Sequence, residues 1–179
     1  MRYNTRNEKE SKNMKKKEIL LITFIFITIF SIIIIKPISD LDELWNYNTA
    51  RAISEGLIPY KDISMITTPL LPIITAIFLK VIANEVIISR ILAAILWTVI
   101  LFMIYKVFIL LFKEENISLI CVALIGILCR NIYCIDYNVL VLLIAIVILY
   151  MELKNFEITN SKKNLLIRSF SRTCNMYKT

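Results

Sequence analysis

Histidine is missing from this chain, which has only two glycines and four cysteines in 179 residues. Without histidine, catalytic triads with an imidazole base and zinc sites with imidazole ligands are excluded. The cysteines, at positions 121, 129, 134 and 174, do not have the spacing of a zinc site or a disulfide framework. Three of them lie in or beside apolar stretches, where cysteine usually serves as a small buried hydrophobic residue. Any chemistry of this chain is therefore expected to depend on carboxylates and cations.

Apolar residues make up 58% of the chain, and its mean hydropathy is +0.72. Both values exceed those of an ordinary soluble domain. The net charge of +7 comes from basic residues at the two ends and at short breaks between apolar runs, as in membrane orientation signals. No basic stripe is interleaved with exposed aromatic residues, so nucleic acid is not an expected partner. The predicted fold class is an all-α polytopic membrane protein.

The first apolar run, residues 19–35, contains no charge and follows a basic segment, residues 1–18. At about 1.5 Å per residue it is about 25 Å long, which is enough to cross a bilayer with help from its flanks. A cleaved signal peptide is the alternative, but the run is long for one and Ile-Lys-Pro-Ile at residues 35–38 is a poor cleavage site. We expect a retained anchor in the cell membrane with its N-terminus in the cytoplasm.

The rest of the chain predicts four or five transmembrane helices. Residues 36–68 form an external loop with a short interfacial helix that starts near Asn48 and ends at Gly56, since glycine accepts the left-handed conformation at a helix end. Residues 69–82 are either a short spanning helix or a helix in the interface. The positive-inside bias favours the interface. This arrangement places Asp136 outside, and the expected spans are residues 19–35, 88–111, 117–135 and 138–152.

An ordered series of residues follows the first span. It comprises Asp-Leu-Asp-Glu-Leu-Trp at 40–45, Ala-Arg at 50–51, Gly56, Pro-Tyr-Lys-Asp at 59–62 and Thr-Pro-Leu at 68–70. This series resembles the first external loop of GT-C glycosyltransferases, the polytopic enzymes related to protein O-mannosyltransferases and the aminoarabinose transferase of lipid A. The resemblance covers roughly residues 15–160, so residues 19–160 are expected to be the N-terminal part of a GT-C transmembrane domain.

The resemblance implies transfer of a sugar from a polyprenyl-phosphate donor to an acceptor at the outer face of the membrane. It implies catalytic roles for Asp42 and Glu43. The residues that it suggests for substrate binding are Arg51, Tyr60, Asp62, Arg90 and Asp136. A carboxylate at the membrane edge could act as a general base. Carboxylates without histidine suit a hard divalent cation such as Mg²⁺ or Mn²⁺, and Asp42 and Asp136 are the expected ligands if one binds.

Each of these residues also has an ordinary structural explanation. The acids Asp40, Asp42 and Glu43 could open a helix, where they favour its N-terminal dipole. Asp62 could belong to a turn, and Asp136 could cap a helix. Arg90 could extend to the lipid headgroups, and Trp45 and Tyr47 could belong to an interfacial aromatic belt.

Residues 161–179 are polar and basic, where the GT-C family normally begins another membrane helix. We therefore expect this tail to mark a frameshift or truncation near residue 168. Two other functions stay open. One is a non-catalytic membrane subunit or scaffold that uses the loop for contacts. The other, less favoured, is part of a transporter, because Arg90 and Lys106 are intramembrane charges.

Overall fold

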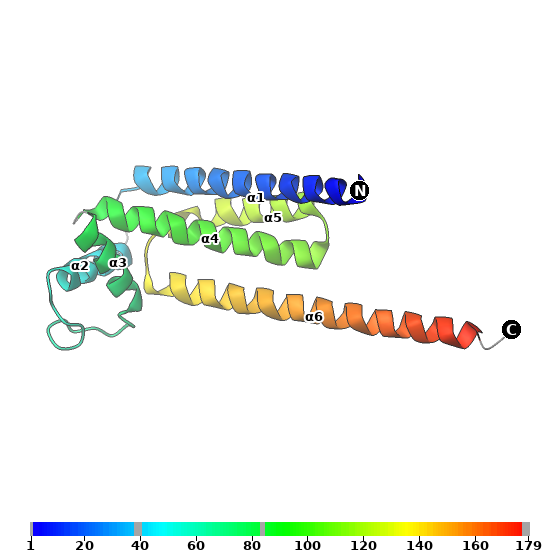
Figure 1. Ribbon diagram of the computed structural model, residues 1–179. Coiled ribbons are helices and arrows are strands. Elements are labelled where there is room, and N and C mark those ends of the chain that lie inside the picture. Colours follow the sequence, from blue (N-terminus) through cyan, green and yellow to red (C-terminus); the bar gives the residue numbers. More distant parts are fainter. Residues whose placement is uncertain (1, 38–40, 83–84, 177–179) are drawn as a thin grey trace.

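The computed structural model describes residues 2–37, 41–82 and 85–176 of the chain. Four long helices run side by side: α1 (Arg2–Ile35), α4 (Val86–Phe112), α5 (Glu115–Leu128) and α6 (Tyr137–Met176) (Figure 1). A 3₁₀ turn, η1 (Cys129–Ile132), continues α5. The two short helices, α2 (Leu41–Ser54) and α3 (Leu70–Val81), gather at one end of the bundle (Figure 1). The described residues contain no β-strand.

Four of these segments are long and apolar enough to cross a membrane. They are Lys16–Ile35, Val86–Phe112, Glu115–Ile132 and Tyr137–Thr159. In hydrocarbon an isolated segment can satisfy its backbone hydrogen bonds only as a helix, so runs of this composition adopt no other regular structure there. The prediction of an all-α polytopic membrane protein is confirmed.

Helix α3 belongs to the end of the bundle. Its 12 residues give a length of about 18 Å, well short of a hydrocarbon core of about 30 Å. It packs mainly against α2, and the start of α4 lies next to the pair (Figure 1). Pro72 is accommodated because it lies in the first turn of α3, where its missing N–H has no partner in the helix. The sequence left two alternatives for residues 69–82, a short spanning helix or a helix in the interface. The position of α3 corresponds to the second alternative, which has four spans.

Three boundaries differ from the sequence prediction. Helix α2 begins at Leu41 instead of near Asn48, because the acids at 42 and 43 occupy its first turn, where the helix dipole favours them. It ends before Gly56, whose φ of 104° is the predicted left-handed conformation. Helix α5 changes to a 3₁₀ turn at Cys129, several residues before the apolar run ends. Helix α6 continues to Met176, well into the polar segment.

Helix α4 is the centre of the bundle, since α1, α5 and α6 each pack against it. Its buried face includes Ala93, Ala94, Trp97, Ile100 and Leu101. The facing stripe of α1 is Ile25, Ile29 and Ile33, spaced by four residues as one helical face requires. The other helices contribute only part of their surface, and most of the apolar side chains of α5 and α6 point away from the bundle.

The end of the bundle opposite α2 and α3 is held by charge pairs. Lys106 of α4 pairs with Glu18 of α1, and Lys113 at the end of α4 pairs with Glu157 of α6. Lys17 of α1 lies 3.7 Å from Glu115 of α5, measured from Nζ to Oε2. At the other end, the Lys36 ammonium at the close of α1 donates to the backbone carbonyl of Asn131. Each end therefore gathers segments that are far apart in the sequence.

This arrangement predicts which segments share a side of the membrane. In a variant with its native cysteines replaced by serine, Ser64→Cys and Asn131→Cys should react with an impermeant maleimide from the same side. Asn116→Cys, at the start of α5, should react only from the opposite side. All three positions are exposed, so accessibility of the side chain does not bias the comparison. Labelling of positions 64 and 131 from opposite sides would show that residues 69–82 cross the membrane.

Candidate functional site

The most distinctive polar feature of the molecule is a buried ion pair between α2 and α4. The Nε atom of Arg90 lies 3.0 Å from Oε1 of Glu43, and the two side chains are only 11% and 5% exposed. Glu43 is in the first turn of α2 and Arg90 is near the start of α4. Because this pair is removed from water, the loss of either partner would leave an uncompensated buried charge, so neither charge can lose its partner cheaply.

Further buried polar side chains lie on the same elements. Asn46 follows Glu43 by three residues and therefore lies on the same face of α2. Its Nδ2 donates to the backbone carbonyl of Asp42 at 2.9 Å, but its buried Oδ1 accepts no hydrogen bond from the part of the chain that is described. Ser89, next to Arg90, is fully buried and donates to the carbonyl of Val86. The contact between α2 and α4 is thus polar as well as apolar.

Asp42, the predicted base, lies beside this pair but on another face of α2. Consecutive residues of a helix point about 100° apart, and Asp42 is exposed where Glu43 is buried. The ion pair therefore fixes the helix turn that carries Asp42, while Asp42 itself faces outward. Asp40, grouped with these acids in the sequence, lies outside the described residues.

The predicted substrate-binding residues of the loop have local partners. Arg51 pairs with Glu55, the residue just after the end of α2, at 3.0 Å between Nε and Oε1, and this hydrogen bond raises the pKa of Arg51 above its ordinary value. Tyr60, with a left-handed φ of 65°, donates its hydroxyl to the carbonyl of Thr67 at 3.0 Å. Asp62 accepts the N–H of Ile58 at 2.9 Å, which is the turn role that competed with a functional one.

Asp136 caps helix α6. Its Oδ1 accepts the backbone N–H groups of Asn138 at 2.8 Å and Val139 at 3.0 Å, as an N-cap acid does. It lies in the connection between η1 and α6, at the same end of the bundle as α2 and α3 (Figure 1).

The described residues contain no group of three or more Asp, Glu, Cys or His side chains that could hold a metal ion. Asp42 and Asp136 were the ligands expected from the sequence if a divalent cation binds. The oxygens of Asp136 already accept hydrogen bonds from its own helix turn. The geometry of the described residues therefore offers no support for a metal at this pair.

The sequence did not predict the pairing of Glu43 with Arg90. The two residues are 47 positions apart. From the sequence, Arg90 was predicted to bind substrate or to extend to the lipid headgroups. One feature of the sequence was consistent with the pairing. The predicted topology places the starts of α2 and α4 at the same edge of the membrane, and Glu43 and Arg90 near those starts have opposite charges. The buried amide of Asn46, between the aromatic belt candidates Trp45 and Tyr47, had no comparable signal.

Comparison with known proteins adds no relative to this description. No protein-family model matches the chain, and neither a curated protein nor a solved structure matches it. The interpretation of the site therefore depends on its own geometry and on the sequence resemblance.

Substitution at the ion pair should reveal its contribution to stability. Glu43→Gln or Arg90→Gln alone should lower the free energy of unfolding in mixed micelles by about 2–3 kcal/mol, because each leaves a charge buried without its counterpart. The double variant should lose less than the sum of the two. Arg51→Gln, which breaks an exposed pair, serves as the control and should have little effect. Strictly additive losses in the double variant would show that the pair is not coupled.

Proposed function

We propose that the chain is part of a membrane glycosyltransferase of the GT-C type, which transfers a sugar from a polyprenyl-phosphate donor to an acceptor at the membrane surface. The observation that carries this proposal is the position of Asp42. It is an exposed carboxylate on a helix turn fixed by the buried Glu43–Arg90 pair, at the end of a bundle of membrane spans. The ordered loop residues that resemble the family lie at this same end.

Glycosyl transfer from a lipid phosphate needs a base for the acceptor hydroxyl and a cation for the departing phosphate. Asp42 is suited to the first role because it is accessible, and a positioned general base contributes about 10²–10⁴-fold to the rate. Glu43 is suited to a supporting role, in which it holds the helix turn that carries Asp42. It is buried and bound to Arg90, so it is not accessible to an acceptor. The acid pair predicted from the sequence thus divides into an outward base and an inward anchor.

The geometry favours Arg90 over Arg51 as the cation near Asp42. Arg51 follows Asp42 by nine residues, which at about 100° per residue places it on the opposite side of α2 and about 13 Å along the axis. Arg90 contacts the residue next to Asp42. Its described bond uses Nε, while a guanidinium has five N–H donors in all, so further donors are available to a phosphate oxygen.

The membrane position fits a lipid-linked donor. A polyprenyl chain lies in the hydrocarbon, so its phosphate is held at the boundary with water. Helices α2 and α3 lie at one end of the four candidate spans (Figure 1), where that boundary would be in a membrane. An acceptor from the aqueous side and a donor from the lipid side would meet there.

A second candidate function is a non-catalytic subunit of a larger membrane assembly. It is favoured by the small share of each span that the bundle covers: 17% for Lys16–Ile35 and 11% each for Glu115–Ile132 and Tyr137–Thr159. Surfaces of this kind face lipid or other helices. In this case Asp42 would serve contacts with a partner instead of catalysis.

The two functions predict different results for Asp42→Asn. For a transferase, incorporation of labelled sugar from a polyprenyl-phosphate donor in membranes containing the chain should fall at least about 100-fold, since the general base is lost. Glu55→Gln, which removes an exposed acid just after the end of the same helix, should leave incorporation unchanged. Unchanged transfer by Asp42→Asn at equal protein levels would rule out the catalytic assignment. Loss of a co-purifying enzyme in the same variant would favour the subunit.

A further inference from the structure

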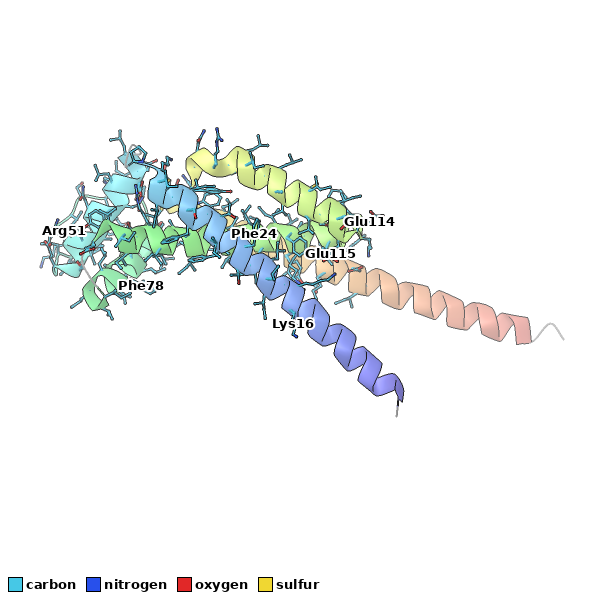
Figure 2. All side chains as sticks on the ribbon, turned by 90° about the horizontal axis from the view of Figure 1, so that it is seen from above. Lys16, Phe24, Arg51, Phe78, Glu114 and Glu115 are labelled. Carbon is cyan, nitrogen blue, oxygen red and sulfur yellow. The ribbon has the colours of Figure 1, made fainter. Side chains whose placement is uncertain are left out.

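An apolar groove runs between α1 and α5, with α4 as its floor. Its volume is about 560 Å³, within the range of about 300–1,000 Å³ typical of ligand sites. Leu21, Ile25 and Ile32 line it from α1, Ala123 and Gly126 line it from α5, and Leu101 lies beneath. Figure 2 shows these two helices diverging from the α2–α3 end toward Lys16 and Glu115.

The polar atoms inside the groove already have partners. The hydroxyl of Thr28 donates to the carbonyl of Phe24 at 2.9 Å, and that of Tyr133 donates to the carbonyl of Gly126 at 2.6 Å. Burial raises the pKa of Tyr133 to about 12, so its hydroxyl stays uncharged. The interior therefore offers an occupant apolar contact and no hydrogen bond.

On α1 the apolar groove extends from Leu21 to Ile32, which is about 16 Å at 1.5 Å per residue. A second, more polar hollow continues from it toward Lys17 and Glu115, since Leu21, Phe24 and Leu119 line both. The apolar part alone is long enough for one acyl chain, because half of a hydrocarbon core of about 30 Å is about 15 Å.

The two ends of the groove differ in charge. Arg130 lines the end near α2 and α3, and Lys36 reaches the adjoining Asn131 carbonyl. In the part of the chain that the structure describes, no carboxylate pairs with either cation. Toward the opposite end, Lys17 and Lys106 are matched by Glu115 and Glu18. Among these described residues, the two cations at the α2–α3 end thus have no carboxylate partner, whereas Lys17 and Lys106 at the opposite end do.

We propose that this groove binds an acyl chain of an anionic glycerophospholipid, with the lipid phosphate at Arg130 and Lys36. The proposal is independent of sugar transfer. Its basis is an apolar groove long enough for one acyl chain, together with the two cations at the end near α2 and α3.

Native mass spectrometry of the purified full chain in detergent tests the proposal. Phosphatidylglycerol and phosphatidylcholine with identical acyl chains are supplied at equal concentrations. Two cations at a lipid phosphate should give a preference of about tenfold or more for phosphatidylglycerol. The double substitution Arg130→Gln with Lys36→Gln should abolish the preference. Lys17→Gln, which removes one positive charge at the opposite end, should keep it.

A second pair of variants tests the groove itself. Ala123→Phe places a ring in the groove and should reduce retention of both lipids, whereas Ala145→Phe, on an exposed part of α6 outside the groove, should not. Equal retention of the two lipids by the wild type would overturn the proposal. So would an unchanged preference in the Arg130→Gln, Lys36→Gln double variant, or unchanged lipid retention in Ala123→Phe. So would retention of a polyprenyl phosphate in place of phosphatidylglycerol when both are present, or a dimer that Ala123→Phe dissociates.

Discussion

The packing of the other spans on α4 is the constraint on which the structure depends. Within hydrocarbon, water offers no reward for bringing apolar helices together, so close van der Waals contact must hold them. The N-terminal half of α4 provides this contact through small, fully covered residues, Ser89, Ala93 and Ala94, which let neighbouring backbones approach. Larger residues, Trp97, Ile100 and Leu101, then fill the space further along.

The same helix connects the membrane bundle to its polar end. The ring of Trp97 packs against Tyr133 with centroids 5.1 Å apart, and its Nε1 donates to the carbonyl of Cys134 at 3.0 Å. That bond holds the connection between α5 and α6 against the core. Arg90, directly after Ser89, holds α2 through its ion pair with Glu43. Rigid packing in the hydrocarbon thus positions both loops that carry the candidate functional acids.

The sequence resemblance and the geometry support each other at Asp42 and diverge elsewhere. Asp62 and Asp136 accept backbone N–H groups and stabilise a turn and a helix start. An aspartate that stabilises a turn and an aspartate that acts on a substrate are the same residue type. The sequence resemblance alone therefore does not distinguish these two roles for Asp62 and Asp136. Glu43 and Arg90, 47 positions apart in the chain, form a buried ion pair. Both residues of the resemblance therefore have a shared structural role.

The sequence by itself determined the helical class, the four long spans, the left-handed end at Gly56 and the possibility that residues 69–82 lie in the interface. These follow from hydropathy, length and local backbone preferences, which act over a few neighbouring residues. Only the tertiary structure decided that Glu43 meets Arg90, that α3 lies against α2, and that α1 and α5 enclose a groove ending at Arg130. Such contacts join residues tens of positions apart, and apolar helix surfaces of similar composition give no sequence signal for which faces meet.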